Sequence, residues 1–254
     1  MDLHQLEQHL DATPALRAHK QYFLSLAQPA VAIKLGPSKG QALQSRFGGQ
    51  PMVPRSFTWP EHPEGHYLFV GQINFAELPD GPGRPAELPT SGLLSLFYGL
   101  DEDDNIFWRD EDYLKAFYWT DLSDMHEIVA PHRWVTGSRE VLFENSIDIP
   151  RHEELRNDWP VAFEELYDWF DALEESGVLP RGYLLGTPSW DSLGYDPTPD
   201  LKEYPSSSHW RSLLTLQSHN EFHWCWQDGA RLMAFIEDDK LRAHDFGRLQ
   251  VDCG

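Results

Sequence analysis

The chain has 254 residues, with 41 Asp and Glu against 20 Lys and Arg, and its formal net charge is −21 at pH 7. Proteins that bind nucleic-acid phosphates or anionic membrane surfaces present a basic face, so this charge argues against both classes of partner. Hydrophobic residues make up 41% of the chain and aromatic residues 13%, which is too rich in core-forming side chains for a disordered acidic tail. The composition indicates a globular protein whose large partners are basic.

The cysteines and the apolar segments indicate the compartment. Cys225 and Cys253 form no Cys-x-x-Cys motif, and the first twenty residues carry acids and histidines within their apolar positions, unlike a signal peptide. No run approaches the roughly 18 apolar residues of a membrane span. We therefore expect a cytoplasmic protein and a single domain over residues 1–254.

Residues 1–28 are predicted to be a helical N-terminal segment. Thr13 and Pro14 are a favoured pair for the N-cap and first position of a helix, and Pro29 ends the segment. Apolar residues recur at helical spacing after this start: Leu16, Tyr22, Phe23 and Leu26.

Most of the remaining chain predicts short strands separated by turns. Residues 36–66 are rich in Gly and Pro and predict a long loop. The predicted strands are 31–35, 67–75, 93–98, 106–108, 116–120, 141–144, 183–185, 212–217, 221–226 and 231–236. Because strands and helices do not alternate as βαβ units, we expect a mainly β, α+β fold with antiparallel, roll-like sheets and helical insertions.

A helical insertion is predicted over residues 152–177, with its acidic part at 160–176. Pro160 suits the first helical position and Gly177 a C-terminal stop. One apolar stripe runs along the predicted helix: Leu155, Trp159, Phe163, Leu166, Phe170 and Leu173.

The negative charge is concentrated in residues 101–175, which hold 22 Asp or Glu and six Lys or Arg. Glu174 and Glu175 fall in the last helical turn, where the helix dipole disfavours anions, so local helix stability does not explain them. Two interpretations stay open: a solvated surface, or a surface that attracts a basic partner. The candidate partner-binding residues are Asp101, Glu102, Asp103, Asp104, Asp110, Glu111 and Asp112 in the first cluster, and Glu164, Glu165, Asp168, Asp171, Glu174 and Glu175 in the second.

Motifs for catalysis, cofactors and metals are weak. The run HNEFH at 219–223 has its Glu in the wrong place for a zinc helix, and no Walker loop, Gly-x-Ser-x-Gly elbow or dinucleotide fingerprint occurs. A Ser-His-Asp triad could still assemble in space. We expect no catalytic residue, no cofactor and no metal site.

Several segments follow one another in a recognisable order: SRFGGQPMVPRSFTWP, FVGQINFAELP, LPTSGLLSLFY, YLLGTPSW, LLTLQSHNEFHWCWQDGARLMAFI and HDFGRLQVDC. Together they resemble the YwqG-like family, a bacterial domain of unknown function. The resemblance runs from about residue 45 to the C-terminus and implies a mainly β, roll-like domain with no established catalytic activity. It also implies an immunity-type role, because members look like proteins that occur beside bacterial toxin genes. The chain departs from the family pattern after Pro188, with SWDSLGYD.

The charge predicts an acidic protein-binding module, and the resemblance implies that this module is an immunity-type inhibitor that neutralises a bacterial toxin. A nuclease toxin fits best, because its active site must be basic to hold phosphates. The alternative is a small-ligand binder or an unrecognised enzyme, with a pocket near Gln72, Asn74, Gln217 and Trp226. A passive scaffold with an acidic surface is a third possibility.

Overall fold

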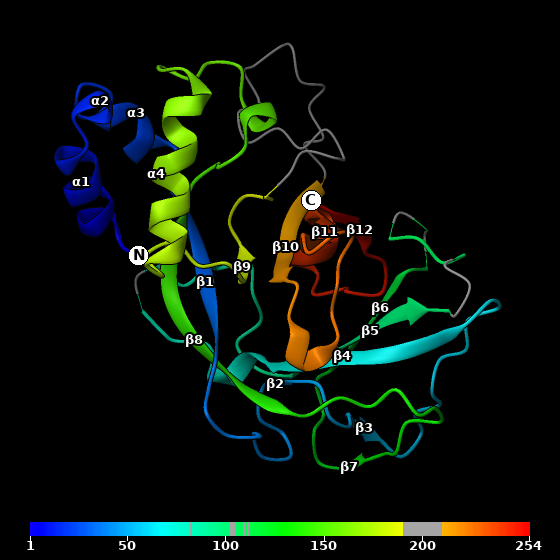
Figure 1. The fold of residues 1–254 in the computed structure, drawn as a ribbon. Helices are drawn as coiled ribbons and strands as arrows, with labels where there is room; N and C mark the ends of the chain where they lie inside the picture. The colour runs from blue at the N-terminus through cyan, green and yellow to red at the C-terminus, as the bar shows by residue number, and fades with distance from the viewer. Residues whose placement is uncertain (82, 102–104, 109, 111, 190–209) are drawn as a thin grey trace.

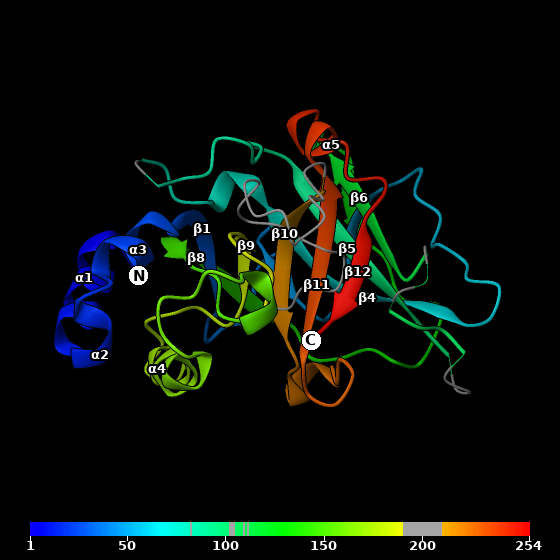
Figure 2. The ribbon, with the colours of Figure 1, turned by 90° about the horizontal axis from the view of Figure 1, so that it is seen from above.

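The fold is built on one strongly curved antiparallel sheet. The computed structural model describes residues 1–254 except 82, 102–104, 109, 111 and 190–209. Of the described chain, 32% is strand and 21% helix, and ten strands form a sheet nearly closed into a barrel (Figures 1 and 2). The expected mainly β, antiparallel fold with a few helices is therefore confirmed. The ten strands are β1 (Gln28–Leu35), β2 (Arg46–Phe47), β4 (His66–Asn74), β5 (Leu93–Leu100), β6 (Leu114–Trp119), β8 (Arg139–Asp148), β9 (Tyr183–Leu185), β10 (Trp210–Gln217), β11 (Arg231–Glu237) and β12 (Gln250–Cys253).

The strand order is β12-β11-β10-β9-β1-β8-β2-β4-β5-β6, which leaves β12 and β6 as edges. Register shifts between Phe69 and Gly71 in β4 and between Ser212 and Leu214 in β10 mark irregularities that favour bending of the sheet. A separate two-stranded sheet pairs β3 (Met52–Pro54) with β7 (Met125–Glu127). The Gly- and Pro-rich segment 36–66 thus contributes two very short strands, β2 and β3, within the predicted loop.

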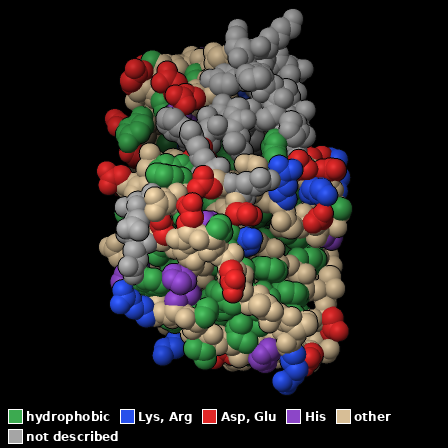
Figure 3. Space-filling model, turned by 90° about the vertical axis from the view of Figure 1, so that its right-hand side faces the viewer, with side chains coloured by type: hydrophobic (Ala, Val, Ile, Leu, Met, Phe, Trp, Pro, Cys, Tyr) green, Lys and Arg blue, Asp and Glu red, His purple; other side chains and the backbone are tan. Residues whose placement is uncertain are grey.

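The two faces of the sheet are packed differently. The concave face holds the main apolar core, with side chains from β4, β5, β10, β11 and β12. On the outer face of β4 and β5, Tyr67, Phe69 and Phe97 pack against the partly buried rings of Phe57, Trp59 and Phe117. Figure 3 shows hydrophobic side chains gathered over this side of the molecule. Aromatic side chains therefore pack on both the concave and the outer face of the sheet.

A layer of helices covers the outside of β1 and β8 (Figures 1 and 2). The helices α1 to α3 and the longer α4 bury a second apolar cluster that includes Leu10, Phe23, Leu166 and Phe170. α1 begins with a capping box between Asp2 and Gln5. The helices are α1 (Leu3–Ala12), α2 (Pro14–Arg17), α3 (Lys20–Ser25), α4 (Phe163–Glu175) and α5 (Asp238–Arg242), with short 3-10 turns at η1 (Phe75–Glu77), η2 (Glu153–Leu155) and η3 (Asn220–Phe222).

Three predicted elements differ from the structure. Residues 106–108 form no strand, because the carboxylate of Asp101 accepts the N–H groups of Asn105 and Ile106 and folds the segment into a turn. Residues 221–226 alternate exposed and buried as a strand does, but His223 adopts a left-handed φ of 56° and breaks the predicted strand. α4 begins at Phe163 rather than near Pro160, while Gly177 ends it as predicted, with a φ of 72°.

A buried group of charges fixes α4 to the sheet. The side chain of Glu174 is 9% exposed and accepts hydrogen bonds from Arg151 and Arg231. Arg151, 4% exposed, also donates to Asp148 and to the carbonyl of Pro180. Arg151 follows β8 and Arg231 begins β11, so one carboxylate joins α4 to two parts of the sheet. Burial disfavours the charged form of Glu174, but Arg151 and Arg231 outweigh this effect and hold its pKa below the ordinary 4.5.

We expect Glu174→Gln to lower the free energy of unfolding at pH 7 by about 3–5 kcal/mol, because it removes one partner of a buried ion pair and leaves the arginines uncompensated. A carboxylate with a lowered pKa stabilises the fold fully above pH 4.5 and loses this contribution as the pH falls through its folded-state pKa. The difference between the wild type and Glu174→Gln should therefore shrink as the pH falls below 4.5, as measured by urea denaturation across pH.

Glu175→Gln is the matched control, since Glu175 is the next residue and is exposed. Its unfolding free energy should stay close to that of the wild type at every pH. Equal effects of the two substitutions would contradict the role given to Glu174.

Candidate functional site

One groove lies where the sheet splits beside β9, an interior strand of only three residues. β9 pairs with β1 only at Ala30–Ala32 and with β10 only at Leu214 and Thr215. Beyond it, the carbonyl of Gly182 still accepts the N–H of Ile33 at 2.9 Å. β1 continues to Leu35 and β10 to Gln217, so the ends of these two strands have no strand between them (Figure 1). A groove of about 340 Å³ opens there, which we call the β1–β10 groove.

The floor of the β1–β10 groove is aromatic. Phe47 of β2 contacts Trp224 with ring centroids 5.4 Å apart and Phe222 at 6.3 Å, and the last two rings lie 4.6 Å apart. All three are buried, and Leu216 and Ile33 add aliphatic walls. Small-molecule sites are typically concave and mostly apolar, with volumes of about 300–1,000 Å³, and this groove falls within that description.

The rim carries polar side chains and positive charge. Among the described residues that line the groove none is Asp or Glu. The Lys34 ammonium is paired with Glu144 at 2.6 Å. Arg181, 41% exposed, lies 3.7 Å from Glu174 by its Nε atom, which donates no hydrogen bond to any described residue. The polar rim residues are Lys34, Arg181, Gln217 and His219.

Two glycines allow the aromatic floor to form. Gly48, with a φ of 68°, donates its N–H to Val70, and a Cβ there would stand 2.1 Å from the carbonyl oxygen of Gly137. A Cβ on Gly71 would stand 2.5 Å from the ring of Phe47. Only glycine leaves room for these approaches. The Gly-Gly loop and the Val-Gly-Gln strand therefore place Phe47 against the aromatic residues that follow β10.

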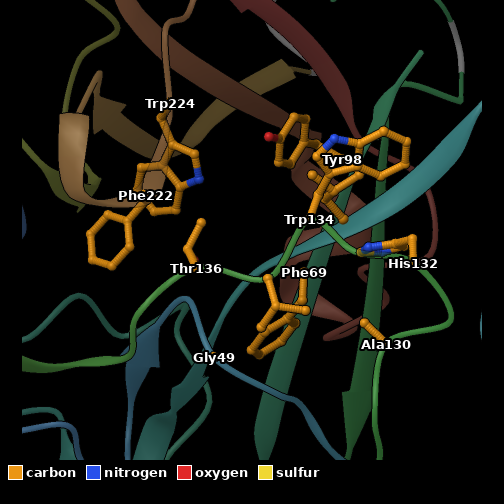
Figure 4. Close-up of a pocket in the computed structure, with 11 residues that line it drawn as sticks. Gly49, Phe69, Tyr98, Ala130, His132, Trp134, Thr136, Phe222 and Trp224 are labelled. Carbon is orange, nitrogen blue, oxygen red and sulfur yellow. The ribbon is translucent and has the colours of Figure 1, made fainter. Parts of the chain in front are cut away.

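A second hollow lies on the other side of Phe222 and Trp224. Figure 4 shows these rings on one side of it and Tyr98, Trp134 and His132 on the other. The space that remains is about 10 Å³, roughly enough for one water molecule. Burial lowers the pKa of His132, although its contact with the Tyr67 carbonyl at 3.1 Å opposes the shift. Packed side chains fill most of this region. They therefore support Phe222 and Trp224, which also form a wall of the groove.

The four residues predicted to line a pocket do not meet in one cavity. The amide of Gln72 donates to the carbonyls of Ala42 and Gln44 and accepts from the N–H of Met52. Asn74 likewise donates to Leu43. Of the two interpretations of these amides, the geometry therefore fits satisfied groups that fasten the long loop to β4.

The other two predicted pocket residues lie apart from β4. Trp226 is buried in the barrel core against Tyr98, with ring centroids 5.1 Å apart. Gln217 is exposed at the end of β10 and lines the β1–β10 groove. One of the four predicted residues thus belongs to the site that the fold forms.

The acidic residues predicted on α4 fall into two groups. Glu174 is enclosed by arginines, which supplies the reason for an acid in the last helical turn that the helix alone does not give. The exposed group surrounds Tyr167, which is 59% exposed. No ion pair to a described residue is seen for its members, which are Glu164, Glu165, Asp168, Asp171 and Glu175. We call this group the α4 acidic face.

The first acidic cluster lies in the connection between β5 and β6. Asp101 and Asp110 accept backbone N–H groups of their own turn, and Asp112 lies 3.6 Å from Lys115. Glu102, Asp103, Asp104 and Glu111 lie outside the described residues. Figures 1 and 2 show this connection and α4 at opposite ends of the molecule. A single compact partner surface would therefore meet one cluster and not both.

The sequence missed most of the groove. Arg181 and Gly182 lie in no motif, and the Gly-Gly segment that contains Phe47 predicted only a loop. The groove depends on β9 being short, which local patterns do not show. Besides Gln217, which was predicted as a pocket residue, the alternation of Phe222 and Trp224 with polar residues was an available signal. Among the described residues, no group of three or more His, Cys, Asp or Glu is placed to hold a metal ion.

The comparisons with known proteins define a family but no activity. The family model described as "Domain of unknown function (DUF1963)" matches residues 45–253. No curated protein matches the sequence. None of the described helices has the length and apolar character that crossing a bilayer needs. The match includes both segments that build the groove floor, the Gly-Gly loop and the run that follows β10.

Proposed function

The chain belongs to the DUF1963 family, whose function is unknown, and we propose that it binds a small organic molecule in the β1–β10 groove. The observation that carries this proposal is a groove of about 340 Å³ with a buried aromatic floor and a polar rim. Binding here replaces the predicted pocket on the Gln-Ile-Asn strand, whose amides are occupied by the loop.

The construction of the groove supports binding of a ligand with a flat apolar body. Phe222 and Trp224 of the floor are packed on their other side against the region that Figure 4 shows, which leaves little empty space. A ligand would therefore meet a preformed surface. Gly48 and Gly71 allow the close approaches to Gly137 and Phe47 that place the floor rings. A preformed surface lowers the entropic cost of binding.

Filling the groove should abolish binding. Gly182 lines the groove, and a Cβ there would make only ordinary contacts, the nearest at 3.5 Å from the carbonyl oxygen of Thr215. We expect Gly182→Met to fold normally and to weaken binding of the neutral probe 2-naphthamide at least about tenfold, a change of ~1.4 kcal/mol. Ligand-observed NMR line broadening would measure it.

Gly137→Met is the control, because Gly137 also has open space around its Cβ position and does not line the groove. It should bind the probe like the wild type. Absence of probe binding to the wild type at millimolar concentration, or equal binding by both variants, would refute the groove as the ligand site.

We propose a second function on a different surface: the α4 acidic face binds a basic protein, as in an immunity-type inhibitor of a toxic nuclease. The supporting observation is that five carboxylates lie exposed around Tyr167 without an ion pair to a described residue. Aromatic residues within charged surfaces often anchor protein interfaces. This proposal includes two further statements: that the chain is a YwqG-like protein, and that it meets its toxin in the cytoplasm.

Neutralising the α4 acidic face tests this second function. With the product of a neighbouring gene as the partner, sub-micromolar binding should be lost in high salt. The variant Glu164→Gln, Glu165→Gln, Asp168→Asn should slow association about tenfold at low salt. Asp110→Asn with Asp112→Asn, at the opposite end of the molecule, should leave the rate unchanged. No binding to any neighbouring gene product would sink the proposal.

A further inference from the structure

The charge lining the β1–β10 groove is opposite to that of the protein. The chain carries a net charge of −21, yet the described lining includes Lys34 and Arg181 and no Asp or Glu. The carboxylates nearby are already engaged: Glu144 with Lys34, Glu221 with Arg139 at 3.1 Å, and Glu174, which lies 3.7 Å from Arg181, with Arg151 and Arg231. An anion that approaches the groove therefore meets a local positive site, while the rest of the surface repels it.

Arg181 is the surplus cation of the buried charge group. Three arginines surround the two carboxylates of Asp148 and Glu174. Both oxygens of Glu174 already accept hydrogen bonds, one from Arg151 and one from Arg231. Arg181 stands at 3.7 Å, outside hydrogen-bond distance, with its Nε donating to no described residue. The Nε is buried beside Glu174, but no hydrogen bond from the two terminal nitrogens of Arg181 to a described residue is seen, so these nitrogens keep their donors for another acceptor.

The position of Arg181 links the charge to the aromatic floor. It immediately precedes Gly182, whose carbonyl is the last link between β9 and β1. Arg181 and Gln217 also line a neighbouring hollow of about 420 Å³ towards α4, so they stand at one end of the groove. A planar ligand on Phe47 and Trp224 would direct a substituent at that end towards a guanidinium and an amide.

From this arrangement we propose that the ligand of the groove is an aromatic or similarly flat organic anion whose carboxylate is bound by Arg181. The inference rests on the proposed ligand-binding function of the groove. Guanidinium and carboxylate groups form paired, charge-assisted hydrogen bonds, the strongest polar contacts that the rim can offer. Gln217 supplies a further donor at the same end.

A series of matched probes tests the inference: 2-naphthoate, its neutral counterpart 2-naphthamide, and 2-naphthylmethylammonium. Calorimetric titration should show the carboxylate binding about tenfold more tightly than the amide, as expected for a charge-assisted hydrogen bond, and the ammonium most weakly. In Arg181→Gln the advantage of naphthoate over naphthamide should disappear while naphthamide binding is unchanged. Arg181→Lys should keep part of the advantage.

Arg55→Gln is the control, because Arg55 is an exposed arginine that pairs with Asp124 and does not line the groove. It should leave the preference for the carboxylate intact. Equal binding of naphthoate and naphthamide to the wild type would overturn the anion inference and leave the groove as a ligand site. A carboxylate preference that survives in Arg181→Gln would overturn it too, whereas failure of every probe would overturn the proposed function itself.

Discussion

One buried carboxylate organises the side of the molecule on which the groove lies. Glu174 comes from α4, and the arginines around it come from the segment after β8, the approach to β9 and the start of β11. A charge removed from water must be paired, so these four segments hold one another at fixed distances. The helical layer is fastened to the sheet at this point as well as through its apolar contacts. The same pairing leaves Arg181 at the end of the groove, 3.7 Å from Glu174 and without a hydrogen bond to it.

The groove itself follows from the shortness of β9. β9 has three residues and lies between two strands of eight, so the ends of β1 and β10 have no strand between them, although each stays paired on its other side with β8 or β11. The sheet opens where β9 ends. Elsewhere the concave face is filled by packed side chains, as the small residual hollow beside Trp224 illustrates. The site is thus a local interruption of the sheet rather than the interior of a barrel. Rigid aromatic packing behind the floor preserves its shape.

Much of the fold was predictable from local sequence patterns, and most of the site was not. The strands around Tyr67–Phe75 and Arg231–Ile236 and the end of α4 at Gly177 follow from residue alternation and turn chemistry. The strand predicted at residues 106–108 was wrong because the Asp101 carboxylate accepts backbone N–H groups there and stabilises a turn. The sequence grouped Glu174 with the exposed acids of α4. Its burial could not be predicted because it depends on Arg151 and Arg231, which lie 23 and 57 residues away along the chain. Gln72 seemed equally suited to a pocket or a core, and the contacts of its amide with a distant loop decide between them.

Binding of a flat organic anion in the β1–β10 groove, through the aromatic floor and Arg181, can be tested directly. The most direct measurement is a titration of the ¹⁵N-labelled protein with 2-naphthoate, followed by NMR of the arginine Nε–H, tryptophan indole and backbone amide signals. We expect chemical shift changes at Arg181, Gly182 and Trp224 and none at the indole of Trp159 in the helical layer. Shifts confined to α4 or to the outer aromatic face around Trp59, or no shifts at millimolar ligand, would contradict it.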